Sequence, residues 1–303
     1  MKQMTADYIY TIDKHILNTS YFPKVSFCIP TKNEAGFIED CLKSILTQNY
    51  PDVEIIIVDA YSTDKTVDIA KQYGCNVYYD SISLGNSRQI SINKSTGDIL
   101  AIWDADIIIP HCNWLMNAVI LFKKFNNLST VWPKPISPDR GSWAQKCYFA
   151  HSKLIFQDRI KNKRGVFGGG NSLFLRASVE SVGGFDITYN FGEDMILAKR
   201  LKDSGYSVVY YNDSIVHNTM RSLKEIYHRS LWGSEAFKKQ GIDFYQQSKS
   251  DMIRENIFLG FIGMFKGLIR GEMFWLIFPL MIAIKSLAYS GILFAKSKIK
   301  LEV

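Results

Sequence analysis

Strand-like and helix-like segments alternate about every 15 residues in the first third of the chain, and this alternation constrains the fold most strongly. The predicted strands are 24–30, 53–58, 75–80 and 98–104, and the predicted helices are 36–47, 62–74 and 85–97. The strands are continuously apolar, which is typical of strands that are covered on both faces of a sheet. The sequence therefore predicts an α/β fold in which helices sandwich a mostly parallel sheet.

Polar side chains follow three of these strands at the point where each strand ends. The first strand ends in Pro30, Thr31, Asn33 and Glu34, the second in Asp59, and the fourth in Asp104 and Asp106. The carboxyl ends of parallel strands meet at one edge of a sheet, where such folds bind their ligands. We therefore expect these side chains to converge on one crevice.

Asp104 and Asp106 stand within the apolar run ILAIWDADIIIP. Two carboxylates in such a run are costly to bury unless something compensates their charge. A hard cation such as Mg²⁺ or Mn²⁺, shared with substrate phosphates, would do so. The alternative is a capping aspartate beside a solvated one. His217, which closes a later predicted strand, is either a third metal ligand or a polar residue at a strand end.

Three further acidic residues have both a structural and a functional interpretation. Asp59 can accept a hydrogen bond from a ribose hydroxyl or a base N–H, or it can belong to the start of the helix that follows. Glu193 and Asp194 open a predicted helix over 193–204. A carboxylate at a helix N-terminus stabilises the helix, and it is also well placed to act as a general base.

Glycines 168–170 and Asn171 precede another apolar strand, where the backbone can approach a ligand closely or form a mobile loop. No Gly-Lys-Ser/Thr follows these glycines, which excludes a Walker loop. The first strand also lacks a Gly-x-Gly-x-x-Gly sequence after it, which argues against a dinucleotide-dependent enzyme.

Charge and cysteine content suggest a reducing compartment and anionic partners. The net charge of +7 suits phosphates, nucleotides, nucleic acid or an anionic membrane surface. The five cysteines are scattered and odd in number, which favours reduced thiols in the cytosol. The N-terminal segment lacks an apolar stretch of signal-peptide length.

The C-terminal part of the chain is apolar and predicts membrane association. Residues 273–295 have the length of one membrane span, but Lys285 interrupts them and Pro279 can kink them. Alternatively, 257–270 and 273–295 form helices that lie in the membrane interface or make a short hairpin, which the basic C-terminus favours. A buried helical dimer interface is the remaining alternative.

In their order along the chain, these motifs resemble those of the family 2 glycosyltransferases, which are inverting enzymes with a GT-A fold. The resemblance covers about residues 24–218. It rests on IPTKNEAGFIEDCLKSILTQNYPDVEIIIVDAYSTDKT, on LGNSRQISINKSTGDILAIWDAD, and on GGGNSLFLRASVESVGGFDITYNFGEDMILAKRLKDSGYSVVYYNDSIVH.

The resemblance implies a role for each matching residue. The nucleotide would be held by Pro30, Thr31, Glu34, Asp59, Arg88 and Asp104. Mn²⁺ or Mg²⁺ would be bound by Asp106, Asp104 and His217. The Glu193–Asp194 pair would supply the catalytic base, with Asp194 deprotonating the acceptor, and Gly169, Gly170 and Asn171 would line the sugar site.

The chain also departs from the family pattern. Ala60 replaces a second aspartate, and Gln89 follows Arg88 where asparagine is common. The Gln-x-x-Arg-Trp signature of processive polymer synthases is missing, so we expect transfer of one sugar per encounter. The expected donor is a nucleotide sugar, with UDP favoured, and no nucleic acid partner is expected.

The expected acceptor is a lipid-linked group, such as a polyprenyl phosphate, or a surface glycan precursor. A nucleotidyltransferase and a sugar-nucleotide-binding scaffold without turnover are the alternatives from other classes. The expected location is the membrane, with the catalytic domain in the cytoplasm. The expected organisation is an N-terminal extension (1–22), a catalytic domain (23–218, with its nucleotide-binding half over about 23–110 and its acceptor half over about 111–218), connecting helices (219–250) and an apolar tail (251–303).

Overall fold

The computed structural model describes residues 22–162, 169–240 and 249–298. The chain divides into two compact units. Unit 1 comprises 1–135 and 166–217, and unit 2 comprises 136–165 and 218–303. Residues 136–165, which were expected to lie within the catalytic domain, group with the C-terminal helices, and the expected boundary at 218 stays a prediction. The assignment of 136–165 to the catalytic domain therefore stays a prediction.

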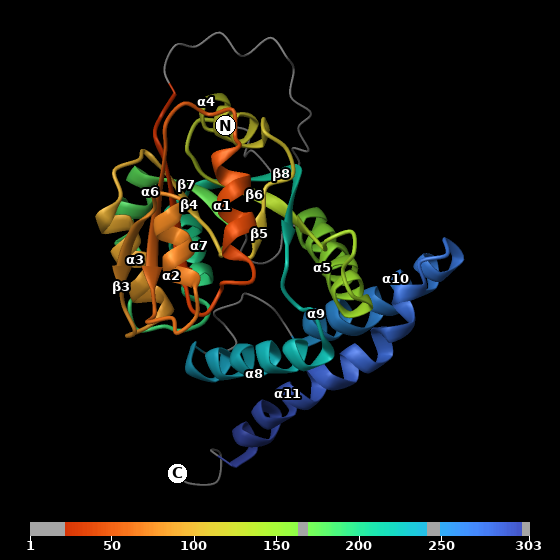
Figure 1. Cartoon of the computed structure of the whole chain (residues 1–303). Coiled ribbons are helices and arrows are strands. Elements are labelled where there is room, and N and C mark those ends of the chain that lie inside the picture. Colours follow the sequence, from red (N-terminus) through yellow and green to blue (C-terminus); the bar gives the residue numbers. More distant parts are fainter. Residues whose placement is uncertain (1–21, 163–168, 241–248, 299–303) are drawn as a thin grey trace. The chain divides into compact units, whose positions relative to one another are not determined.

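One eight-stranded sheet in the order β3-β2-β1-β4-β7-β6-β8-β5 forms the centre of unit 1 (Figure 1). Its strands are β1 (Val25–Thr31), β2 (Val53–Asp59), β3 (Asn76–Tyr79), β4 (Ile99–Ile102), β5 (Ile107–Ile108), β6 (Leu128–Ile136), β7 (Ser172–Leu175) and β8 (Ser207–His217). The first four strands pair in parallel. The pairs β4–β7, β6–β7 and β5–β8 are antiparallel. The expected mostly parallel sheet is therefore a mixed one.

Helices of unit 1 cover both faces of this sheet, as the uniformly apolar strands predicted. They are α1 (Ile38–Leu46), α2 (Thr66–Gln72), α3 (Leu84–Lys94), α4 (Trp114–Lys124), α6 (Arg176–Ser181) and α7 (Glu193–Asp203). Side chains of α1, α2 and α4 pack with Phe27 and Ile57 in one core. Side chains of α3, α6 and α7 pack with Cys28 and Leu100 in the other. Alternate residues of β1 thus enter opposite cores, as the two-residue period of a strand requires.

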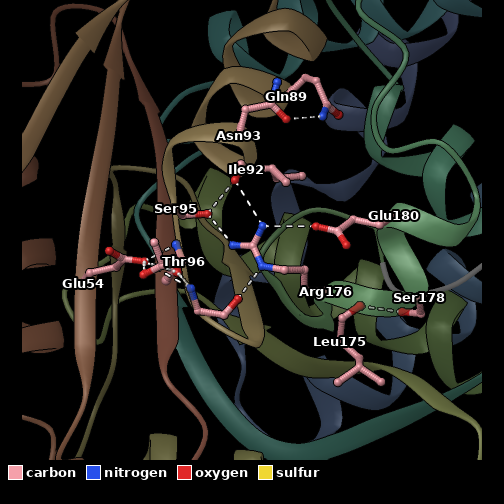
Figure 2. Close-up of polar contacts among 12 residues, drawn as sticks. Glu54, Gln89, Ile92, Asn93, Ser95, Thr96, Leu175, Arg176, Ser178 and Glu180 are labelled. Atoms are coloured by element: carbon pink, nitrogen blue, oxygen red, sulfur yellow. Dashed lines mark hydrogen bonds and ion pairs between the residues drawn. The ribbon is translucent and has the colours of Figure 1, made fainter.

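A polar network fixes the segment between α3 and β4 (Figure 2). The Arg176 guanidinium donates to the carbonyls of Gly97 and Ile92 at 2.5 and 3.2 Å and to Ser95 Oγ at 2.7 Å. Glu54 accepts from the backbone N–H of Thr96 at 2.6 Å. These bonds connect the segment before β4 to β2 and α6. They therefore fix the amino end of β4, the end opposite to the one that Asp104 follows.

Unit 2 is helical. It contains α5 (Trp143–Lys161), α8 (Leu223–Gln240), α9 (Lys249–Ile253), the π-helical turn η3 (Arg254–Phe258), α10 (Leu259–Ile269), the 3₁₀ turn η4 (Met273–Ile277) and α11 (Phe278–Lys298). Trp275, Phe278 and Met281 are buried in its core. Across the three described stretches of the chain, we find no helix with both the length and the apolarity to cross a membrane, so the expected span at 273–295 is not supported.

Candidate active site

Asp104, Asp106 and His217 come together at the edge where β4 ends and β5 and β8 pair. In the antiparallel register of these two strands, Ile107 lies opposite His217. His217 Nε2 consequently lies 3.2 Å from Asp106 Oδ1 and 3.9 Å from Asp104 Oδ2. One ligand atom from each of the three residues lies within 4.8 Å of the other two.

The chemistry of this donor set fits a divalent cation. Two carboxylates provide hard oxygen ligands, which suit Mg²⁺ and Mn²⁺, and the imidazole nitrogen adds a donor that transition metals accept more readily than Mg²⁺ does. All three residues are only half-buried, so a substrate phosphate has access to the same ion. The three residues expected from the sequence to bind metal thus form a chemically suitable site.

Arg88 lies between Asp104 and the helix that carries the expected catalytic base. Its Nη2 donates to Asp104 Oδ1 at 3.1 Å, and its Nε donates to Glu193 Oε1 at 2.9 Å. The Arg88 and Glu193 side chains are only 4% and 2% exposed, so this ion pair is shielded from water. Burial and the nearby Asp194 raise the pKa of Glu193 to about 7, against the opposing effect of the Arg88 guanidinium.

This arrangement separates the roles of Glu193 and Asp194. The Glu193 carboxylate is enclosed with Arg88, which makes it a positioning group and leaves it no access to an acceptor. Asp194 is half-buried, and its carboxylate accepts from the backbone N–H groups of Gly170 at 2.5 Å and Met195 at 2.8 Å. Of the two expected catalytic residues, only Asp194 therefore has the accessibility that a general base needs.

The Gly169–Asn171 segment orients both functional carboxylates. The Asn171 amide donates to Asp104 Oδ2 at 2.8 Å, and its oxygen accepts from the Asp104 backbone N–H at 2.8 Å. Asn171 has φ 57°, a left-handed conformation that asparagine tolerates well. A Cβ atom on Gly169 would lie 2.8 Å from Asp194 Oδ2, closer than real Cβ contacts allow. These residues were expected to line a sugar site; the observed contacts add a positioning role.

The loops after β1 and β2 form the remainder of the edge. Asp59 is fully buried, and its carboxylate accepts from Thr31 Oγ1 at 2.7 Å and from the Ser62 N–H and Oγ at 2.7 and 2.6 Å. The Glu34 N–H donates to Thr66 Oγ1 at 2.7 Å, and Pro30 pairs with Val58 within the sheet. These contacts join the two loops, and the direct nucleotide contacts expected of these residues stay predictions.

Sequence reasoning missed two features of this site. It placed Arg88 near a nucleotide, but the pairing of Arg88 with Glu193 joins positions 105 residues apart. It also missed the support that Asn171 gives to Asp104. The signal for the Arg88–Glu193 pair was Glu193 itself, an acidic residue at the start of a predicted helix, because a buried arginine requires an acidic partner.

Comparison with known proteins finds a matching family model and similar proteins. The family model described as "Glycosyl transferase family 2" matches residues 26–183. Glycosyltransferase AglE of Haloferax volcanii is 31% identical over 225 residues, which cover 69% of this chain and 71% of that protein. A Methanococcus voltae enzyme is 25% identical over 269 residues, which cover 77% of this chain and 75% of that enzyme. Its name is dolichyl N-acetyl-alpha-D-glucosaminyl phosphate 3-beta-D-2,3-diacetamido-2,3-dideoxy-beta-D-glucuronosyltransferase.

Among solved structures, the fold is similar to that of the mannosyltransferase PcManGT from Pyrobaculum calidifontis, which was solved in complex with GDP-Man and Mn²⁺. The TM-score is 0.62 at 19% sequence identity, and the alignment covers 91% of this chain and 89% of the other. At this level of identity the likeness concerns the fold.

Proposed function

The chain belongs to glycosyltransferase family 2 and is a glycosyltransferase with a nucleotide-sugar donor, and from this premise we propose that it transfers one sugar, with inversion, to a lipid-linked acceptor. The UDP sugars remain the favoured donors, and the acceptor atom is a hydroxyl or phosphate oxygen. The observation that carries the proposal is the placement of an accessible Asp194 and the Asp104–Asp106–His217 cluster at one sheet edge, on either side of the Gly170–Asn171 backbone.

In the proposed reaction, Asp194 takes the proton of the acceptor hydroxyl while that oxygen attacks the anomeric carbon of the donor. The bond between the anomeric carbon and the diphosphate breaks, and the nucleoside diphosphate leaves with the electron pair. The two N–H donors from Gly170 and Met195 fix the orientation of the Asp194 carboxylate for this transfer. Mn²⁺ or Mg²⁺ held by Asp104, Asp106 and His217 would supply positive charge to neutralise the leaving diphosphate.

A donor screen tests this proposal. The full chain is incubated with Mn²⁺ or Mg²⁺ and a panel of UDP-, GDP- and dTDP-sugars, with and without total membrane lipid, and nucleoside-diphosphate release is measured. We expect release from one donor, stimulation by lipid, and loss of release in Asp194→Asn with retained donor binding. Release that persists undiminished in Asp194→Asn would refute the assignment of the base.

We also propose that the enzyme works at a membrane surface, with its catalytic unit on the cytoplasmic side. The support comes from the distribution of side chains on α10, where the inner face is made of glycines. Added Cβ atoms on Gly260, Gly263 and Gly267 would collide with Phe278 or Trp275. Large apolar side chains instead occupy the outer face of α10 and the end of η3 before it. Phe258, Phe261, Ile262, Phe265 and Ile269 are 43–71% exposed.

This order is the reverse of that in a helix that faces water, where large apolar side chains point inward. In the segments that follow α10, Met273, Leu276 and Leu280 are also each at least 50% exposed. Lys266 and Arg270 are exposed among these side chains and can contact anionic lipid headgroups. A lipid surface would cover these exposed apolar side chains and bring a lipid-linked acceptor to the enzyme.

Vesicle flotation tests the membrane proposal. The full chain should float with vesicles that contain anionic lipid, and the double variant Phe261→Ser, Phe265→Ser should float several-fold less. Leu46→Ser is the matched control, because Leu46 is 52% exposed and lies in α1 of unit 1. Equal flotation of the double variant and the wild type would contradict the assignment of this face.

A further inference from the structure

Two tyrosines at the ends of β2 and β3 form an exposed stacked pair that the proposed chemistry does not use. The ring centroids of Tyr61 and Tyr79 lie 5.5 Å apart with an angle of 27° between the ring planes. Tyr61 is 59% exposed and Tyr79 is 47% exposed. An aromatic pair of this size in solvent forms a flat apolar surface at the ligand-binding edge of the sheet.

The backbone of Tyr61 is held in a conformation that tyrosine rarely adopts. Its φ is 56°, in the left-handed region where a residue with a bulky side chain is an outlier. The preceding Asp59 accepts two hydrogen bonds from Ser62, which closes the turn around Tyr61. The Lys32 ammonium donates to the Tyr61 carbonyl at 2.9 Å from the β1 side. Glycine would adopt this conformation without strain, so the backbone conformation does not account for a tyrosine here.

The sheet order places this pair where one end of a nucleotide should lie. Asp104 follows β4, and the strand order β4-β1-β2-β3 leads from it to Tyr61 and Tyr79. Two to three strand spacings separate these positions, about 10–14 Å, which is within the reach of a nucleoside diphosphate from its phosphates to its base. On the other side of β4 lies β7, and the Gly169–Asn171 segment that precedes β7 binds the Asp194 carboxylate. That side must stay open for the acceptor, because Asp194 is the proposed base.

We propose that the Tyr61–Tyr79 pair is the platform on which the base of the donor nucleotide stacks. The proposal rests on the proposed function, because it requires a nucleoside diphosphate at the Asp104 edge. Base–aromatic stacking is tolerant of base identity, since every base has a π-face. The platform therefore contributes affinity for the nucleoside part of the donor, with little discrimination between bases.

Calorimetric titration in the presence of Mn²⁺ tests this assignment with three ligands: UDP, GDP and inorganic pyrophosphate. The informative variant is Tyr61→Gly, because glycine removes the ring and relieves the left-handed strain in one change. We expect about tenfold or more weaker binding of the preferred nucleoside diphosphate, unchanged binding of pyrophosphate, and a melting temperature no lower than that of the wild type. Tyr61→Phe should retain the affinity.

Ile82→Ala is the matched control, because Ile82 is an aliphatic side chain that is 74% exposed in the loop after β3. It should bind all three ligands as the wild type does. Unchanged nucleotide affinity in Tyr61→Gly would overturn the platform alone, and so would an equal loss for pyrophosphate, which would indicate a distorted site. A wild-type chain that binds neither UDP nor GDP would overturn the proposed function together with the platform.

Discussion

Replacement of Arg88 by methionine should destabilise the fold more than most single substitutions do. Arg88 is 4% exposed in its side chain and pairs with Glu193, which is 2% exposed. Methionine fills much of the same volume but leaves the Glu193 carboxylate buried without its cation. Loss of one partner of a buried ion pair costs about 3–5 kcal/mol in the free energy of unfolding. Chemical denaturation of the full chain at pH 8 measures this cost.

A double-mutant cycle separates the ion pair from packing. Glu193→Gln removes the charge and keeps the shape, so the amide in the Arg88→Met background should recover about 1–3 kcal/mol of the lost stability. Additive effects within about 0.5 kcal/mol would refute the coupling that we infer from the 2.9 Å contact. If Arg88→Met does not fold, Arg88→Lys supports the same cycle with a retained charge and a changed geometry.

The pH dependence of the Arg88→Met deficit provides a second check. Burial and Asp194 already raise the pKa of Glu193 to about 7 in the presence of Arg88, and removal of the guanidinium raises it further. A folded-state pKa above the unfolded value destabilises the carboxylate at high pH and has no effect below the unfolded value of about 4.3. The deficit should therefore be larger at pH 8 than at pH 5. Equal deficits at the two pH values would point to lost packing as the cause.

Three further predictions follow from the site and from unit 2. Asp106→Asn should raise the Mn²⁺ concentration needed for calorimetric donor binding at least tenfold, and unchanged metal dependence would remove Asp106 from the ligand set. Gly169→Ala should lower kcat about 10- to 100-fold with unchanged nucleotide affinity, because the new methyl group displaces the Asp194 carboxylate. Gly36→Ala is the control and should match the wild type, because there is open space around Gly36. Burial and the nearby Arg159 lower the pKa of Lys285 to about 8. Lys285→Met should therefore stabilise the chain by about 1–2 kcal/mol at pH 7, as measured by thermal unfolding. This gain should shrink as the pH rises from 8 toward 10.5, because the lysine loses its charge over that range.

The parallel half of the sheet was predictable because its strands are buried on both faces. The residues of β2 from Ile55 to Val58 are all buried, so the run has no polar gaps and cannot be mistaken for loop. The β6 strand was not predicted, because Pro133 and Pro135 in its second half normally exclude a central strand. Its registered pairing with β7 involves Thr130 and Val131, which precede both prolines and can donate their N–H groups.

The Asp104–Asp106–His217 cluster was predictable from the sequence only in part. The Asp-Ala-Asp spacing was sufficient to suspect a cation, but His217 lies more than a hundred residues later and had no spacing relation to the aspartates. What brings it within 3.2 Å of Asp106 is β5, a strand of two residues that pairs with the end of β8. Three isoleucines after an aspartate carry no periodicity from which such a short strand could be inferred.

The β5–β8 pairing also constrains how the site can vary. Register in a two-residue ladder depends on which side chains become buried, and Ile107 is fully buried while Ile108 is half-buried. A shift of β8 by one residue would direct the side chain at the His217 position to the other face of the sheet and remove the imidazole from the carboxylates. The buried Ile107 side chain therefore contributes to the geometry of the Asp104–Asp106–His217 cluster through the register it imposes, although it carries no donor atom itself.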